Sequence, residues 1–305
     1  MGNYPTDACA AREQGRTATL RVSTVPQLGV NSTMFDAYHE NSIFLQPHAD
    51  DVALSCGGAA AAASGATIIT IFGGEVVGEL SSFAKFKHAR WNVGEFSDVH
   101  STRRVEDAAA ARILGCRLRW LGLPDAIYRG DVYQSDSQLY RLIDGEALEL
   151  AEHLSVELVG LPEWSTSARV YVPLGVGLHA DHQIVFYTGL MLAADGYEVV
   201  AYEDTPYDIH TPDSLKERLK QVDIYLKNPT IFPINSLLNI KLEAVSQYRS
   251  QLPVLFRFNP DYRMAMMDYA EKVGCGMPAE RFWPIDSLKC GKFNMTGGLA
   301  NSLSR

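Results

Sequence analysis

Short apolar runs alternate along the chain with longer segments that mix apolar and polar positions. The short runs are rich in Val, Ile, Leu and Phe, and they predict buried strands at residues 42–46, 66–72, 117–123, 170–174 and 198–202. Between them, apolar positions at helical spacing or Ala-rich stretches predict helices at residues 52–63, 101–115, 137–155 and 184–194. Strands that alternate with helices form mostly parallel sheets with helices on both faces, so we expect an α/β fold.

The two ends of the chain and one internal segment lack this pattern. Residues 1–35 are polar without a sustained period, so we expect a lead-in segment followed by a single domain over residues 36–305. Segment 73–100 follows a strand and has no clear period, which is typical of a loop or short helices over the mouth of a site. From about residue 206 the pattern weakens, and we expect a C-terminal cap region (about 206–305) rather than an independent domain.

Two polar clusters follow predicted strands directly. The first is Pro47-His48-Ala49-Asp50-Asp51, and the second is His179-Ala180-Asp181-His182. Residues three apart on the opening turn of a helix point the same way, so His48 and Asp51 would face one place and Asp50 another. Because right-handed crossovers send every strand-to-helix turn to one edge of a parallel sheet, the two clusters can meet there.

These residue types suit a hydrolytic zinc site, which uses three protein ligands and keeps one position for water. His48 and Asp51 supply two ligands, and we prefer His182 to His179 as the third because His182 begins a helix, as Asp51 does. Iron(II) is an alternative metal for the same ligands. The competing interpretation is that each cluster is only a helix cap or surface polarity, and the presence of both at strand ends favours the metal site.

The remaining polar residues of the clusters have roles in the same chemistry. A bound metal would acidify a water molecule that attacks an amide carbonyl, with Asp50 as the general base. His179, if protonated, would stabilise the oxyanion, and Asp181 would hold the ring of His179 in orientation.

Composition narrows the classes of partner. The chain has 305 residues, of which 47 % are hydrophobic and 21 % charged, as in a globular protein with a substantial core. A net charge of −9 without a basic run makes nucleic acid an improbable main partner, and a neutral or cationic small substrate fits better. No apolar run reaches the roughly 18 residues of a membrane helix. The five widely spaced cysteines indicate neither a disulfide framework nor a zinc knuckle, so we expect a cytoplasmic protein.

The first cluster with the following Gly57-Gly58, together with the second cluster, resembles the two signatures of the LmbE-like/PIG-L family of zinc-dependent N-deacetylases. Weaker matches extend over roughly residues 42–285. The resemblance implies a Rossmann-like fold and the metal, base and oxyanion roles given above. It also implies removal of an acetyl or longer acyl group from an amino sugar or a related metabolite.

Three further residues are candidate substrate contacts: Arg103, Arg104 and Glu203. The alternative is that the two arginines are solvated helix residues and that Glu203 lies in a solvated turn. Two other functions stay open, an amidase for larger conjugates and a non-catalytic sugar-binding protein on the same fold. No feature of the sequence indicates an oligomeric state.

Overall fold

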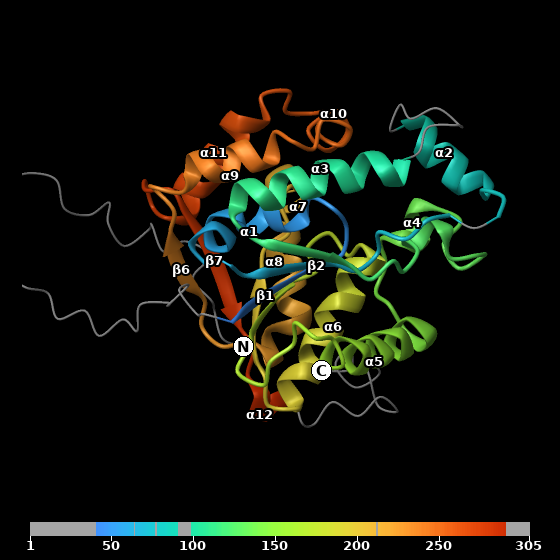
Figure 1. Ribbon diagram of the computed structural model, residues 1–305, viewed down its shortest axis with the longest axis horizontal. Coiled ribbons are helices and arrows are strands. Elements are labelled where there is room, and N and C mark those ends of the chain that lie inside the picture. Colours follow the sequence, from blue (N-terminus) through green and yellow to red (C-terminus); the bar gives the residue numbers. More distant parts are fainter. Residues whose placement is uncertain (1–40, 64, 77, 91–98, 212, 291–305) are drawn as a thin grey trace, which may run out of the picture.

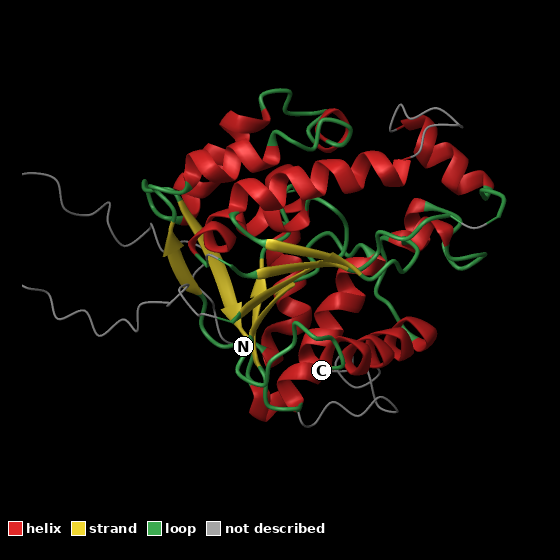
Figure 2. Cartoon of the chain, in the orientation of Figure 1, coloured by secondary structure: helices red, strands yellow, loops and turns green. Residues whose placement is uncertain are grey.

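A mixed sheet lies between two layers of helices in the computed structural model of the chain (Figures 1 and 2). The structure describes residues 41–63, 65–76, 78–90, 99–211 and 213–290, so the predicted lead-in at 1–35 lies outside the described residues. Within these ranges the sheet has seven strands in the order β3-β2-β1-β4-β5-β7-β6. Their bounds are β1 Ser42–Gln46, β2 Thr67–Thr70, β3 Arg117–Trp120, β4 Arg169–Pro173, β5 Glu198–Tyr202, β6 Thr230–Pro233 and β7 Ala279–Pro284.

The first five strands are parallel and correspond to the five predicted ones, which confirms the α/β fold. Strand β7 pairs antiparallel with both β5 and β6. The C-terminal region is therefore more than the cap that we expected, because it adds two strands to the edge of the main sheet. Strand β7 reads Ala-Glu-Arg-Phe-Trp-Pro, in which charged residues interrupt the apolar run that would have identified it.

Twelve α-helices and two 3₁₀ segments connect the strands over the described part of the chain. Their bounds are α1 Asp51–Ala62, α2 Ser82–Arg90, α3 Val99–Leu114, α4 Asp136–Leu139, α5 Gly145–Val159, α6 Ala180–Ala194, α7 Tyr207–His210, α8 Ser214–Val222, α9 Leu238–Val245, α10 Leu252–Leu255, α11 Tyr262–Val273 and α12 Ser287–Cys290, with 3₁₀ turns at Ala126–Tyr128 and Asp223–Tyr225. The single helix expected over residues 137–155 is wrong, because the chain turns between α4 and α5. Gly145 has a φ of 43°, which a continuous helix excludes.

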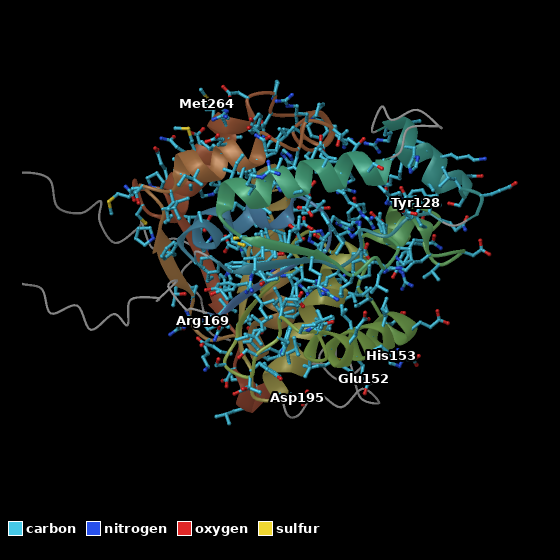
Figure 3. The ribbon with its side chains drawn as sticks, in the orientation of Figure 1. Tyr128, Glu152, His153, Arg169, Asp195 and Met264 are labelled. Atoms are coloured by element: carbon cyan, nitrogen blue, oxygen red, sulfur yellow. The ribbon has the colours of Figure 1, made fainter. Side chains whose placement is uncertain are left out.

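The core has two halves, one on each face of the sheet. Ile43 and Leu45 of β1 pack with α5 and α6, whereas Phe44 packs on the opposite face with α1, α9 and α11. The ring of Phe44 stacks on Tyr171 of β4 at a centroid distance of 4.2 Å. This alternation is what strands buried on both faces require. The side chain of His153, on α5, is exposed (Figure 3).

Helix α1 is broken in its middle, and a buried ion pair occupies the break. Cys56 has a non-helical φ of −133°. The backbone N–H groups of Gly58 and Ala59 each donate to the carboxylate of Glu280 at 2.8 Å. Lys241 Nζ donates to Glu280 at 2.7 Å and to a backbone carbonyl of the first segment at 3.1 Å. The pair therefore satisfies the backbone groups that a break exposes, and the first segment stays anchored where Asp51 begins it.

The order of the strands explains where a ligand can bind. Strand β1 lies between β2 and β4: the chain runs from β1 outward through β2 to β3, and then crosses back to β4 on the other side of β1. A crevice forms at such a switch point, beyond the carboxyl ends of the strands. The turn after β1 carries His48, Asp50 and Asp51, and the turn after β4 leads to His179 and His182. The prediction that the two clusters meet at one edge is confirmed.

None of the helices in the described ranges is long and apolar enough to span a bilayer. Among the cysteines that the structure describes, Cys56, Cys116 and Cys290 are free. Cys275 is disulfide-bonded. Spacing in the sequence did not reveal this bond, because a pairing depends on which segments the fold brings together.

Candidate metal centre and substrate cavity

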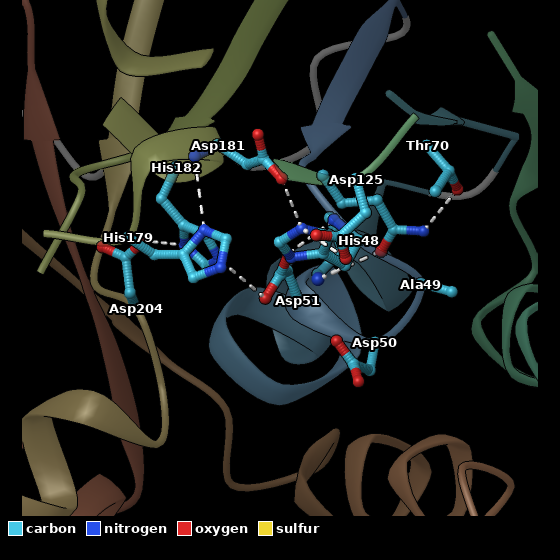
Figure 4. A network of polar contacts seen from close by, with 12 residues as sticks. His48, Ala49, Asp50, Asp51, Thr70, Asp125, His179, Asp181, His182 and Asp204 are labelled. Atoms are coloured by element: carbon cyan, nitrogen blue, oxygen red, sulfur yellow. Dashed lines mark hydrogen bonds and ion pairs between the residues drawn. The ribbon is translucent and has the colours of Figure 1, made fainter. Parts of the chain in front are cut away.

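The turn after β1 separates the two adjacent acids. Asp51 is the first residue of α1, and its Oδ2 accepts a hydrogen bond from the backbone N–H of His48 at 2.8 Å. Asp50 has a φ of 122°, a conformation uncommon for a residue with a side chain. Figure 4 shows the result, with the carboxylate of Asp50 turned away from the histidines that surround Asp51. The two acids are therefore available for different tasks, as the sequence predicts.

The second cluster begins α6. His179 is the N-cap residue of this helix, and its Nδ1 accepts a hydrogen bond from the backbone N–H of Asp181 at 3.2 Å. His182, in the first turn, reaches toward the first cluster. Its ring centroid lies 5.4 Å from that of His48 and 5.3 Å from that of His179.

The three predicted ligands converge on one point between the clusters. His48 Nδ1 lies 3.6 Å from Asp51 Oδ2, and His182 Nε2 lies 3.6 Å from Asp51 Oδ1. With metal–donor bonds of about 2.0 Å, tetrahedral zinc ligands lie roughly 3.3 Å apart, close to these spacings. His48, His182 and His179 also offer three ring nitrogens within 4.8 Å of one another. The cluster therefore suits a divalent metal, with Asp51 or His179 completing the set.

Each of the two predicted histidine ligands has a carboxylate at its other ring nitrogen. Asp181 Oδ2 lies 2.9 Å from His48 Nε2, and Asp204 Oδ1 lies 2.7 Å from His182 Nδ1 (Figure 4). A carboxylate in this position fixes the tautomer of a ligating histidine and leaves the opposite nitrogen free for the metal. Asp204 is itself held, since its Oδ2 accepts the backbone N–H of Val176 at 2.8 Å.

The predicted role of Asp181 needs correction. We expected its carboxylate to orient the ring of His179, but only its backbone N–H contacts that ring. The carboxylate instead contacts His48, the guanidinium of Arg129 at 2.5 Å and the backbone N–H of Ala126 at 3.0 Å. Burial opposes ionisation of Asp181, but Arg129 and His48 hold its pKa below the ordinary value. Asp181 thus remains a carboxylate that can orient His48.

Buried acids and histidines shift one another's pKa values in this site. Burial and the neighbouring Asp51 raise the pKa of Asp50 to about 8, although Arg103 opposes the shift. Burial lowers the pKa of His182, but Asp51 and Asp204 outweigh it and raise the pKa to about 9. The shift of His182, and the part of the Asp50 shift that Asp51 causes, reflect the carboxylates gathered here, whose charge a divalent cation would compensate.

His179 differs from the other two histidines in its electrostatics. Burial and the nearby His48 hold its pKa well below the ordinary value, so the ring is neutral. Because its Nδ1 accepts the N–H of Asp181, the proton of the neutral ring lies on Nε2. His179 can therefore donate a hydrogen bond to the cavity from a neutral ring, and the oxyanion role predicted for it does not require a protonated one.

The converging residues form the inner end of a cavity of about 390 Å³, which is small for a ligand pocket. Asp50 and Arg103 line it, as predicted. Arg103 donates to the carbonyl of Ala49 at 3.1 Å and lies 3.6 Å from Asp50 Oδ2. Arg104 does not line this cavity, and its guanidinium lies over the ring of Trp120.

Glu203 does not line this cavity either. Its buried carboxylate accepts hydrogen bonds from Arg281 at 2.5 Å, Trp283 at 2.9 Å and Tyr269 at 2.7 Å. All three partners come from α11 and β7, the part of the fold that the sequence did not reveal. The structure therefore does not place Glu203 or Arg104 at the substrate, and both bind other parts of the fold instead.

Three residues that line the cavity were not predicted from the sequence. Asp125 lines the cavity 3.4 Å from His48 Nε2. Tyr140 and Tyr207 also line it, and their rings lie against His179 and His182 at centroid distances of 5.4 and 5.7 Å. Asp125 follows a predicted strand, so the rule that identified the other two clusters applied to it. Tyr140 follows the short helix α4 and Tyr207 begins the short helix α7, and neither segment carries such a signal.

The sequence matches a known family and several known proteins. Residues 43–194 match the family described as GlcNAc-PI de-N-acetylase. A 2'-N-acetylparomamine deacetylase of Niallia circulans is 29 % identical over 242 residues, which are 70 % of this chain and 82 % of that protein.

Solved structures share the fold. The crystal structure of the deacetylase of the A40926 pseudoaglycone has a TM-score of 0.66 at 23 % identity, covering 82 % of this chain and 98 % of that one. The zinc-inhibited form of a teicoplanin deacetylase has a TM-score of 0.64 at 20 % identity, covering 80 % and 97 %.

Proposed function

The chain belongs to the PIG-L family of de-N-acetylases, and we propose that it hydrolyses the N-acetyl group of an amino sugar in a divalent-metal-dependent reaction. The products are the free amine and acetate. The observation that carries this proposal is the convergence of His48, Asp51 and His182 at the inner end of a cavity that Asp50 also lines.

His48, Asp51 and His182 would hold the metal, with Asp181 and Asp204 orienting the two rings. A divalent ion there supplies Lewis-acid polarisation of the carbonyl and a lower pKa for water, and we propose zinc, with iron(II) as the alternative. The donor set of two nitrogens and a carboxylate suits either ion.

The chain's own groups handle the protons. Asp50 faces the cavity and is not needed as a ligand, so it serves as the base that accepts a proton from the attacking water. Arg103, 3.6 Å from Asp50, favours the ionised form of that carboxyl. His179 donates from Nε2 to the oxygen that gains negative charge as the carbonyl is attacked. Tyr140 and Tyr207 pack against the histidines and restrict the space around this point.

The substrate class follows from the relatives. The similar protein of Niallia circulans is named a 2'-N-acetylparomamine deacetylase, and one solved neighbour is named a deacetylase of the A40926 pseudoaglycone. We therefore propose an N-acetylated amino sugar within a larger metabolite as the substrate of this chain.

Metal analysis and acetate release test this proposal together. The purified chain should contain about one divalent ion, and a chelator should abolish acetate release from N-acetyl amino sugars. Zinc or iron(II), added back under anaerobic conditions, should restore it, and the more active ion identifies the metal. Full activity after complete removal of metal contradicts the proposal. Binding of N-acetyl amino sugars without acetate release by the metal-loaded protein favours a sugar-binding protein instead.

A further inference from the structure

Basic side chains from two separate elements line the outer end of the cavity. Lys87 and Arg90 come from α2, and Arg257 follows α10. Phe83 of α2 packs in the half of the core with α5 and α6, whereas α10 packs against the half with α1 and α9. The two elements therefore reach the cavity from opposite faces of the sheet. Arg90 and Arg257 are exposed, whereas the histidines and acids at the inner end are buried. Arg90 and Arg257 therefore lie at the mouth of the cavity, one from each element.

Only part of this positive charge is neutralised. Lys87 is buried and forms an ion pair with Asp136, which also lies 3.8 Å from Arg90. One carboxylate thus serves two cations of α2. Arg257 has no ion pair with any residue in the described ranges. The described charged groups at the mouth are then three cations and one anion, in a chain whose net charge is −9.

Both arginines are held in the same way. The guanidinium of Arg90 lies over the ring of Phe86 at 5.6 Å, and that of Arg257 lies over the ring of Phe258 at 4.5 Å. Phe258 is 71 % exposed, which is unusual for a large aromatic side chain. A guanidinium that stacks on a ring keeps its N–H edge free, and this edge matches a carboxylate or phosphate with two parallel hydrogen bonds.

We propose that the substrate carries an anionic group, a carboxylate or a phosphate, on the part that lies away from its N-acetyl group, and that Arg257 and Arg90 bind it at the mouth. This inference rests on the proposed function and adds the charge of the substrate. It differs from the sequence-based expectation of a neutral or cationic substrate. That expectation used the net charge of the whole chain, but recognition depends on the charges that face the ligand.

A matched series of substrates tests the charge preference. The 2-carboxyethyl, 2-phosphoethyl, propyl and 2-aminoethyl glycosides of N-acetylglucosamine share the scissile amide and differ mainly in charge. For the metal-loaded protein we expect KM to be about tenfold lower for the two anionic glycosides than for the propyl glycoside, with similar kcat. The aminoethyl glycoside should have the highest KM. The preference should shrink in high salt, because the mouth is exposed. The two anionic members distinguish a carboxylate from a phosphate.

Two glutamine variants connect the preference to the arginines. Arg257→Gln and Arg90→Gln should each reduce the preference for the anionic glycosides about three- to tenfold and leave KM for the propyl glycoside unchanged. Arg263→Gln is the matched control. Arg263 is exposed on α11 and stacks on Tyr262 at 5.8 Å, but it does not line the cavity. It removes the same charge from the same region of the surface and should change neither parameter.

Calorimetric binding of the same four glycosides separates this inference from the proposed function. Equal affinity for the propyl and anionic glycosides, or an unchanged preference in Arg257→Gln and Arg90→Gln, overturns the anion site even if acetate is released normally. If no glycoside releases acetate, the proposed function fails. Tighter binding of the anionic members that is lost in the two variants would then still support the anion site.

Discussion

Replacing Asp204 with Asn tests whether Asp204 orients His182, a proposed metal ligand, for metal binding. Asp204 is 1 % exposed and has two distinct acceptor tasks, at His182 Nδ1 (2.7 Å) and at the N–H of Val176 (2.8 Å). Asn is nearly the same shape but has only one acceptor oxygen. Whichever way its amide turns, one of the two donors faces an NH₂ group.

The two orientations of the amide have different costs. If the oxygen faces His182, the tautomer is kept and the N–H of Val176 loses its acceptor, which costs about 1–3 kcal/mol of stability for a buried group. If the NH₂ faces His182, Nδ1 becomes the acceptor and the proton moves to Nε2, the atom that points to Asp51. A protonated Nε2 cannot bind a metal. Loss of a carboxylate partner of this kind weakens metal binding about 10–100-fold, equivalent to about 1.4–2.7 kcal/mol.

Competition with a chromophoric chelator measures the metal affinity of the variant, and thermal unfolding of the metal-free protein measures its stability. Glu203→Gln is the matched control, since Glu203 is the adjacent residue and is also buried and fully hydrogen-bonded, but does not line the cavity. It should lower stability and leave metal affinity unchanged. If Asp204→Asn binds metal as tightly as the native chain, the orienting role of Asp204 is refuted.

Three further variants follow from other parts of the structure. Asp50→Asn should lower kcat about 10²–10⁴-fold and retain the metal, as measured by metal content and acetate release; native activity would exclude Asp50 as the base. Gly58→Ala should lower the melting temperature, because a Cβ there meets Ile234 Cγ2 at 2.4 Å, and overpacking costs about 1–3 kcal/mol. Burial and Glu203 raise the pKa of Asp208 to about 7 from 3.8, so the folded state binds its proton more tightly and stability is lost as pH rises from 4 to 7. Asp208→Asn should therefore gain stability relative to the native chain between pH 4 and pH 7 in thermal scans, and parallel pH profiles would contradict this.

The sequence predicted the parts of the site that are local in the chain. His48, Asp50 and Asp51 lie within one turn, and the strand before them is a simple apolar run, so their placement at a strand end follows from spacing alone. The second cluster has the same context. The rule that strand ends meet at one edge then brings the clusters together without knowledge of any contact.

Contacts between distant segments were not predictable in this way. The carboxylate of Asp181 contacts His48, 133 positions away, and not its near neighbour His179. The reason is that α6 directs this side chain toward Arg129 and the turn after β1. The carboxylate of Glu203 is held by Arg281 of β7. The charged residues of β7 interrupt its apolar pattern, so the sequence did not predict this strand. The basic residues at the cavity mouth come from α2 and from the segment after α10, and no local sequence pattern connects these two segments.

The separation of Asp50 from Asp51 depends on the backbone more than on residue type. Two adjacent carboxylates that both served as metal ligands would leave neither free to accept a proton. The φ of 122° at Asp50 turns its side chain away from Asp51 before the helix begins. Arg103 stabilises this uncommon conformation from α3, since it donates to the carbonyl of Ala49 and lies beside the carboxylate of Asp50. Arg103 therefore holds the turn that carries the proposed base, and its role as a substrate contact stays a prediction.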